Sequence, residues 1–337
     1  MTNNQTTALA LYSGGLDSTL TCRVVMAQSI RVLAVKFVTP FFGYDLLARQ
    51  EDHIKETKEK FGIDVFLKDV TVPYLKMVRN PAHGYGKNFN PCVDCKILLL
   101  SEARKMMPEL GASFLVTGEV VGQRPMSQRR DTLRTIERES GCEGILVRPL
   151  CARNLEPTQA ELDGLIDREQ LLNFSGRNRK PQMALADKFG IKDYPSPAGG
   201  CTLTDPIQSV RIREYYEQHE DIVTADIRLL LVGRQFKLPT GGWLIVGRNH
   251  QENLRIENLV QPGDWILEPD DFPGPTVILR YSNDNEELQL AAGILARYSK
   301  KSAVSQGKVN VLAKRDGETL QLETSPLADD IFRSWQR

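Results

Sequence analysis

The chain has 337 residues, 41% of them hydrophobic and 26% charged, which indicates a globular protein with room for two domains. Basic and acidic residues balance to a net charge of zero, so overall charge gives nucleic-acid binding no support, and any such binding depends on local patches. The sequence has neither a long apolar run nor a signal-peptide pattern at its N-terminus, which predicts a cytoplasmic protein with no membrane partner.

The first chemical signal is a turn at residues 13–15, which joins an apolar strand at 9–12 to a helix. Its two glycines can adopt backbone angles closed to other residues, so successive N–H groups can point into one concavity. The positive end of the helix points at the same place. Hydroxyl groups that can add donors belong to Ser13, Ser18 and Thr19. The pattern favours a phosphate cradle over an ordinary strand-to-helix turn, which often needs a glycine too.

Segments of strand and helix type alternate along the first half of the chain. Helices are predicted over 16–28 and 47–61, and strands over 31–38, 64–70 and 114–119. This order is typical of an α/β fold with a Rossmann-like parallel sheet, in which ligands bind at the carboxyl ends of the strands. The glycine turn lies at such an end.

A second signal is the pair Cys92 and Cys95, which a turn-rich loop delivers to the start of a helix expected from Pro91. A helix N-terminus lowers thiol pKa values, so we expect thiolates suited to nucleophilic attack or metal binding. Two cysteines do not complete a tetrahedral zinc site. His83 is a candidate further ligand, but a solvated loop histidine is the simpler interpretation because no second histidine is spaced to share the task.

In a reducing compartment the six cysteines are expected to be ligands, nucleophiles or buried thiols, and not a disulfide framework. Cys201 follows the loop 194–200, whose prolines and glycines predict a rigid segment that presents the thiol. Cys22, Cys142 and Cys151 lack such a setting. We interpret Cys22 as a core residue, with a reactive role as the alternative, and Cys142 and Cys151 as structural or incidental.

Two local basic clusters could contact phosphate. Arg130, Arg134 and Arg138 share one helix face, which fits either an RNA-contacting stripe or a solvated surface partly neutralised by acidic neighbours. The loop 176–180 lies between helices expected at 158–170 and 181–189, and fits either a loop that closes over ATP or a polar connector.

Asp205 and Pro206 mark the expected domain boundary, which divides the chain into residues 1–204 and 205–337. The second part begins with helices and then turns to strands, so we expect a smaller α+β domain. Its predicted helices are 208–218, 225–231 and 286–298, and its predicted strands are 242–248, 264–267, 276–280 and 308–314.

The run Ser13-Gly14-Gly15-Leu16-Asp17-Ser18 resembles the SGGxDS motif of the PP-loop ATP pyrophosphatases. The resemblance implies that ATP is split between its α and β phosphates while a carbonyl oxygen is adenylated. Carried onto this chain, it assigns Asp17 to Mg²⁺ or to orienting the phosphates, since a bare carboxylate would repel them. The residues that would hold pyrophosphate are Ser13, Gly14, Gly15 and Ser18, and further nucleotide-binding candidates are Thr19, Lys36, Thr117 and Gly118.

A longer pattern resembles the TGExLGQxxSQ segment of the 4-thiouridine synthases of tRNA; its residues here are Thr117, Gly118, Glu119, Gly122, Gln123, Ser127 and Gln128. The Asn90–Cys95 run is similar to that of the tRNA 2-thiouridylases, and Arg148-Pro149-Leu150 resembles a triplet of thiolating PP-loop enzymes. These resemblances imply an ATP-dependent tRNA sulfurtransferase, in which sulfur replaces the adenylated carbonyl oxygen of a uridine. The 4-thiouridine synthases usually carry an N-terminal THUMP region, whereas this sequence starts directly with the PP-loop strand. We therefore expect the C-terminal domain to make many of the contacts with RNA.

Cys92, Cys95 and Cys201 form the expected catalytic sulfur site. Three thiolates can hold a [4Fe–4S] cluster with one iron open to sulfide, or one cysteine can carry a persulfide that another resolves. We favour the cluster because all three cysteines are present and no rhodanese-like carrier is attached. The implied partners are tRNA, a sulfur donor (a cysteine desulfurase or inorganic sulfide) and a second copy of the chain in a homodimer.

The second domain resembles the RNA-associated domain of the NFACT proteins. The residues that carry the resemblance are Gly247, Arg248, Asn249, Asn253, Asp264, Trp265, Pro273, Gly274, Val277, Ile278 and Leu279. Glu268 stands where that family often has a histidine, so no role of the histidine is carried over. The cluster 297–301 could contact phosphate or cap its helix.

Two alternative functions remain open at this point. One is a PP-loop enzyme that adenylates a small molecule, which the zero net charge favours. The other is a non-catalytic RNA-binding protein that keeps the nucleotide loop as a switch, against which the intact loop and the three cysteines argue.

Overall fold

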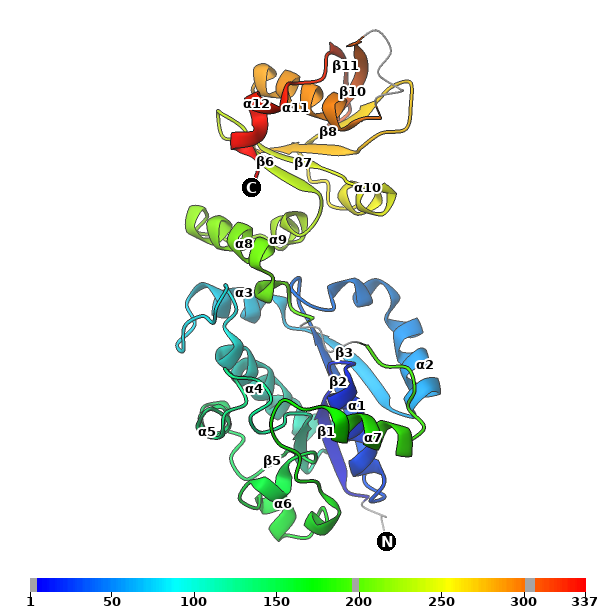
Figure 1. The fold of residues 1–337 in the computed structure, drawn as a ribbon, viewed down its shortest axis with the longest axis vertical. Helices are drawn as coiled ribbons and strands as arrows, with labels where there is room; N and C mark the ends of the chain where they lie inside the picture. The colour runs from blue at the N-terminus through cyan, green and yellow to red at the C-terminus, as the bar shows by residue number, and fades with distance from the viewer. Residues whose placement is uncertain (1–4, 196–199, 301–306) are drawn as a thin grey trace. The chain divides into compact units, whose positions relative to one another are not determined.

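The computed structural model describes residues 5–195, 200–300 and 307–337 (Figure 1). The chain divides into two compact units, Met1–Val210 and Arg211–Arg337, each of which has its own sheet and core. The expected boundary between residues 204 and 205 stays a prediction about where the two domains separate. Within the described ranges, no helix is long and apolar enough to cross a membrane.

The first unit is built on a parallel sheet in the order β3-β2-β1-β4-β5, which confirms the predicted Rossmann-like class. The strands are β1 (Thr7–Leu11), β2 (Arg31–Val38), β3 (Asp64–Asp69), β4 (Phe114–Thr117) and β5 (Leu146–Val147). The chain builds the sheet outward from β1 to β3 and then returns to the other side of β1 with β4. The carboxyl ends of β1 and β4 therefore form the crevice where such sheets bind ligands.

Helices cover both faces of this sheet (Figure 1). They are α1 (Leu16–Met26), α2 (Gln50–Phe61), α3 (Thr71–Arg79), α4 (Cys92–Leu110), α5 (Arg130–Ser140), α6 (Gln159–Leu162) and α7 (Lys180–Lys188), with 3₁₀ helices at Tyr44–Arg49, Ala152–Asn154, Arg168–Gln170 and Thr202–Thr204. Successive side chains of β1 enter opposite cores, because side chains alternate along a strand. Ala8 and Ala10 join the core that includes α1 and α7, whereas Leu9 joins the core that includes α4 and α5.

Two expectations for this unit are corrected. The helix predicted over 158–170 is broken, since Gly164 adopts the left-handed conformation just after α6 and a separate 3₁₀ helix follows. Residues 71–79, for which no helix is predicted, form α3. Its buried face consists of Thr71, Tyr74, Leu75 and Val78, whose spacing is that of one helix face, so the local pattern for this helix was missed.

The second unit is an antiparallel sheet in the order β11-β10-β8-β9-β7-β6, with α11 packed on it. The strands are β6 (Arg234–Lys237), β7 (Trp243–Val246), β8 (Trp265–Pro269), β9 (Val277–Arg280), β10 (Val309–Arg315) and β11 (Glu318–Thr324). The helices are α8 (Pro206–Gln218), α9 (Thr224–Leu230), α10 (His250–Glu257), α11 (Asn285–Tyr298) and α12 (Asp329–Phe332), with a 3₁₀ helix at Arg333–Trp335. The α+β class is confirmed, although the predictions lack β6, β11 and α10.

Candidate nucleotide and sulfur site

The predicted phosphate cradle lies directly after β1. Gly14 adopts a φ of +84°, which favours glycine, and the Lys36 ammonium donates a 2.8 Å hydrogen bond to the Ser13 carbonyl. A Cβ on Gly14 would lie 2.8 Å from the same Lys36 nitrogen. The turn is therefore shaped by glycine and braced by a lysine from the neighbouring strand.

Hydroxyl groups brace the turn from the helix side. Ser18 donates to the Gly15 carbonyl at 2.8 Å, and its oxygen lies 3.2 Å from that of the exposed Ser13. Thr19 donates to the same carbonyl at 3.1 Å and is 1% exposed, which places it beneath the turn. Phosphate contact by these residues stays a prediction, with Ser13 and Ser18 better placed than Thr19.

Gly118 brings the end of β4 into contact with the cradle. A Cβ at this position would lie 2.7–2.8 Å from backbone atoms of Asp17 and Ser18, so this close approach requires glycine. The adjacent Thr117 is buried and donates to Glu119 at 3.1 Å. Both candidate residues thus border the loop, Gly118 through its backbone and Thr117 from below.

The Asp17 carboxylate contacts Gln123 and Arg179, two residues that the sequence motifs did not link to Asp17. Gln123 donates to one Asp17 carboxylate oxygen at 2.8 Å, and Gln182 donates to Gln123 at 3.2 Å. Arg179, from the predicted basic loop, lies 3.6 Å from the other oxygen. That second oxygen is buried and lacks a hydrogen bond within the described residues, so the carboxylate could add a cation as a ligand.

Lys36 lies mostly buried beside the cradle, with its nitrogen 5.8 Å from the centre of the Tyr12 ring. Burial lowers the pKa of the Lys36 ammonium to about 8, because the charged form loses solvation. A phosphate bound in the cradle would restore the charged form by compensating that loss.

Arg148 and Glu119 form a buried ion pair below the cradle. Arg148 is 2% exposed, donates to Glu119 at 3.0 Å and also pairs with Glu137, and Lys96 lies 3.7 Å from Glu119. Burial acts to raise the pKa of Glu119, but Lys96 and Arg148 hold it below its ordinary value. The Arg-Pro-Leu triplet noted in the sequence therefore contributes a structural arginine here.

Tyr74 brings the three predicted sulfur residues into one environment. This buried residue of α3 is within hydrogen-bonding reach of the Cys95 and Cys201 thiols, and Cys92 acts electrostatically on both the phenol and those thiols. The segment after Cys201 is fixed by Thr202, whose N–H donates to the Phe41 carbonyl at 3.0 Å. No sequence motif points to Tyr74, because its contact with the thiols depends on how α3 packs.

Burial opposes the expected helix-dipole effect on these thiols. It raises the pKa of Cys95 although Cys95 lies in the first turn of α4, and it raises the pKa of Cys201 to about 12. The prediction of a dipole-lowered thiol pKa is therefore wrong for Cys95, whereas Cys201 is half-buried and its presentation by the preceding loop stays a prediction. Residues 196–199 of the preceding loop lie outside the described residues.

The three thiols have the chemistry that iron–sulfur clusters use, because thiolate sulfur is their usual ligand. In the ranges that the structure describes, however, no group of three His, Cys, Asp or Glu side chains has the arrangement of a metal site. His83 is not a further member of the group. Its ring nitrogens lie 3.3 Å from carboxylate oxygens of Asp94 and Glu139.

Cys22, Cys142 and Cys151 are fully buried, as predicted for structural residues. The arginines at 130, 134 and 138 lie on the exposed face of α5, where a contact with RNA stays a prediction. In the second unit Arg297 pairs with Asp329 at 2.7 Å, Glu268 pairs with Lys314, and Lys301 lies outside the described residues.

Two family models match the chain at the positions that the motifs predict. Residues 3–157 match the family described as thiamine biosynthesis protein (ThiI), and residues 233–336 match the NFACT protein RNA binding domain. The chain thus contains a segment similar to the ThiI family, followed by one similar to the NFACT protein RNA binding domain. Both resemblances drawn from the motifs are confirmed. No curated protein matches the chain.

Three solved structures show distant likeness to this chain. A 4-thiouridine synthetase bound to RNA and ATP is 21% identical, with a TM-score of 0.39 over 67% of this chain and 52% of that one, so the match spans about half of its length. The U34-tRNA thiolase NcsA of Methanococcus maripaludis, with its [4Fe-4S] cluster, is 17% identical (TM-score 0.33; 67% and 71%). The C-terminal part of the fibronectin/fibrinogen-binding protein of Streptococcus suis is 13% identical (TM-score 0.28; 96% of each).

We predict that Arg148→Met destabilises the PP-loop domain by about 3–5 kcal/mol, because Glu119 would keep a buried charge without its main partner. Chemical unfolding measures the change. Adding Glu119→Gln should restore part of the lost stability. Arg138→Met, which removes an exposed arginine 3.4 Å from Glu139, serves as the control and should cost less than about 1 kcal/mol. Equal losses in the two single variants would contradict the structural role of Arg148.

Proposed function

We propose that this protein is an ATP-dependent tRNA sulfurtransferase that makes a thiouridine. The observation that carries the proposal is the placement of two groups at the same edge of one sheet. The phosphate cradle follows the carboxyl end of β1, and the segment after Cys201 is hydrogen-bonded to Phe41, shortly after the carboxyl end of β2. An adenylating site and a sulfur site on one edge can act on the same base.

The first step would be adenylation of the base. A uridine carbonyl oxygen, at C4 or C2, attacks the α phosphate of ATP and pyrophosphate leaves. Backbone N–H groups of the turn, with Ser13 and Ser18, would hold the leaving pyrophosphate, while Asp17 would bind Mg²⁺ or orient the phosphates. Lys36 would stabilise the negative charge from the side of β2.

The second step would replace oxygen by sulfur. A sulfur nucleophile attacks the activated ring carbon, and the former carbonyl oxygen departs with AMP. The uridine must leave its stack to reach the site. An RNA substrate is supported by the match of residues 233–336 to an RNA binding domain and by the ThiI match of the first domain.

Cys92, Cys95 and Cys201 would deliver the sulfur. A [4Fe–4S] cluster held by these three residues would supply an iron that carries sulfide, and the shared surroundings of all three thiols support this route. The alternative is a persulfide on one cysteine that a second resolves, which needs two of the three. The sulfur donor, either a desulfurase or sulfide, and a homodimer stay predictions.

We predict that Asp17→Ala lowers tRNA-dependent pyrophosphate release by about 100-fold or more, because the charge that organises the phosphates is lost. Nucleoside mass spectrometry of tRNA from cells that lack the protein should show one missing thionucleoside, restored by the wild type and not by this variant. Asp193→Ala removes an exposed carboxylate that pairs with Lys60 and should behave as the wild type. Pyrophosphate release that needs a small molecule and not tRNA would favour the small-molecule alternative.

The lowered pKa of Lys36 predicts that ATP binding depends on pH. In the wild type, affinity should fall as pH rises through about 8, since the ammonium loses its proton and its attraction for phosphate. Lys36→Arg keeps its charge over this range and should show a flatter profile, whatever its absolute affinity. Calorimetric titration with ATP between pH 7 and 9 makes the comparison. If the affinity of the wild type and that of Lys36→Arg change with pH in the same way, the Lys36 ammonium does not interact with the phosphates.

The cluster route predicts iron and acid-labile sulfide in protein purified without oxygen. Substituting Cys92, Cys95 or Cys201 by alanine should remove both, because each cysteine would be a ligand. Cys142→Ser changes a buried cysteine in another part of the core and should keep them. If the wild type carries neither iron nor sulfide but shows a persulfide by mass spectrometry, the persulfide route replaces the cluster.

A further inference from the structure

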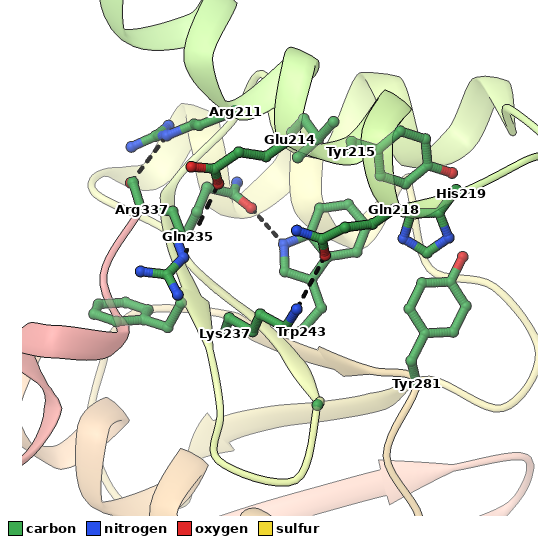
Figure 2. A pocket seen from close by; sticks show the side chains of 13 residues that line it. Arg211, Glu214, Tyr215, Gln218, His219, Gln235, Lys237, Trp243, Tyr281 and Arg337 are labelled. Carbon is green, nitrogen blue, oxygen red and sulfur yellow. Dashed lines mark hydrogen bonds and ion pairs between the residues drawn. The ribbon is translucent and has the colours of Figure 1, made fainter.

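A cavity of about 440 Å³ lies in the second unit, between the end of α8 and strands β6 and β7 (Figure 2). Its volume is within the range of roughly 300–1,000 Å³ typical of small-ligand sites. It can accommodate one nucleotide but not a duplex. Helix α8 lies before residues 233–336, the range that matches the RNA binding domain. The cavity is therefore lined by that domain and by a helix that precedes it in the chain.

Aromatic side chains form one side of the cavity (Figure 2). The rings of Tyr215 and His219 stack with centroids 4.3 Å apart, and those of Trp243 and Tyr281 are nearly parallel, at 18°. Tyr281 is 57% exposed, which is unusual for a ring placed beside other aromatic residues. Exposed aromatic faces of this kind stack on nucleobases.

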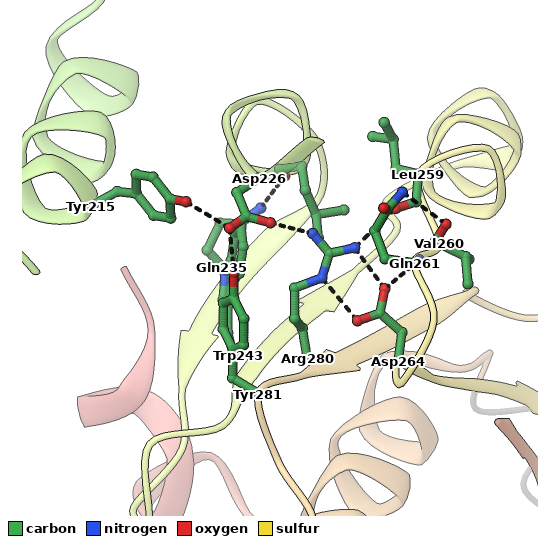
Figure 3. A network of polar contacts seen from close by, with 11 residues as sticks. Tyr215, Asp226, Gln235, Trp243, Leu259, Val260, Gln261, Asp264, Arg280 and Tyr281 are labelled. Atoms are coloured by element: carbon green, nitrogen blue, oxygen red, sulfur yellow. Dashed lines mark hydrogen bonds and ion pairs between the residues drawn. The ribbon is translucent and has the colours of Figure 1, made fainter. Parts of the chain in front are cut away.

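A buried ion network fixes the positions of these rings (Figure 3). Asp226 accepts hydrogen bonds from the hydroxyls of Tyr215 and Tyr281, and also pairs with Arg280. Asp264 holds the other side of the Arg280 guanidinium at 2.6 and 2.8 Å. The Trp243 indole N–H donates to Gln235 at 2.7 Å. Rings held before binding lose little freedom when a ligand stacks on them.

The backbone of Tyr281 adopts a strained conformation. Its φ of +59° lies in the left-handed region, which is sterically unfavourable for a residue with a bulky side chain. Its largely exposed ring lines the cavity, and its hydroxyl contacts the buried Asp226. Strained residues of this kind concentrate at ligand sites.

Basic residues surround the same cavity. Lys237 is exposed on β6, and Arg211 and Arg337 also line the space, while Glu214 is the acidic side chain among the lining residues (Figure 2). Lys237 donates to Gln218 at 3.0 Å, and Arg337 lies 4.0 Å from Glu214. The excess of positive charge beside aromatic rings matches a ligand that has both a phosphate and a base.

We propose that this cavity binds one unpaired nucleotide of an RNA, with its base against Trp243 and Tyr281 and its phosphate toward Lys237. The proposal rests on the proposed function, because it takes the RNA substrate as the ligand. It assigns to the second unit a site that recognises single-stranded RNA. A duplex would not fit, since its bases are stacked and paired.

Tyr281→Asn tests the site, because it removes the ring together with its hydroxyl contact to Asp226, while asparagine tolerates the left-handed conformation. In the full chain this variant should bind a short fluorescent single-stranded RNA about tenfold more weakly than the wild type, the effect of removing one stacking ring. Lys237→Gln should also weaken binding. The control Lys308→Gln removes an exposed lysine of the same unit that pairs with Glu323, and should leave the affinity within about twofold.

Ultraviolet crosslinking of the wild type to the same RNA gives a direct readout. Crosslinked peptides should contain Trp243 or Tyr281, and a duplex of the same sequence should crosslink less. Unchanged RNA affinity in Tyr281→Asn, or crosslinks confined to other peptides, would overturn the proposal.

Pyrophosphate release separates this proposal from the proposed function. If the wild type releases pyrophosphate with tRNA while Tyr281→Asn binds RNA normally, the cavity proposal fails and the function stands. If RNA crosslinks in the cavity but tRNA never stimulates release, the function fails and the cavity proposal stands. If the wild type binds no RNA, both fail.

Discussion

The PP-loop domain depends on the contact between Gly118 and the first turn of α1. The backbones of two segments a hundred residues apart approach so closely that any Cβ at position 118 would overlap Asp17 and Ser18. In the segment that follows Gly118, Gln123 donates to Asp17 and Glu119 accepts from Arg148. One close approach therefore joins the phosphate cradle to the buried ion pair that supports it.

Burial shifts the pKa of three groups at the candidate site of this domain. It lowers the pKa of Lys36 and raises those of Cys95 and Cys201, in each case by disfavouring the charged form. Groups poised in this way gain most from a ligand of opposite charge. A phosphate beside Lys36, or a metal bound to the thiols, would supply the missing compensation.

Motif residues serve two different purposes in this chain. Those of the glycine turn shape an open cradle, whereas Arg148 is buried and holds the fold. In the second unit Asp264 pairs with Arg280, and Asn253 donates to the Gly274 carbonyl at 3.0 Å, so much of the NFACT-like pattern builds the domain. A sequence motif does not distinguish residues that bind a ligand from residues that stabilise the fold. Both ligand binding and tight packing can require a particular residue type at a particular position.

The sequence by itself determined the two fold classes, the cradle after β1, the α4 start at the cysteine pair and the burial of Cys22, Cys142 and Cys151. These features follow from residues close together in the chain, through alternation of apolar side chains and the backbone freedom of glycine. Only the tertiary structure decided that Arg179 faces Asp17, that Tyr74 joins the thiols and that α8 closes a cavity beside Trp243. Such contacts join segments far apart in the chain, and packing of whole elements sets their distances and burial, which local patterns do not encode.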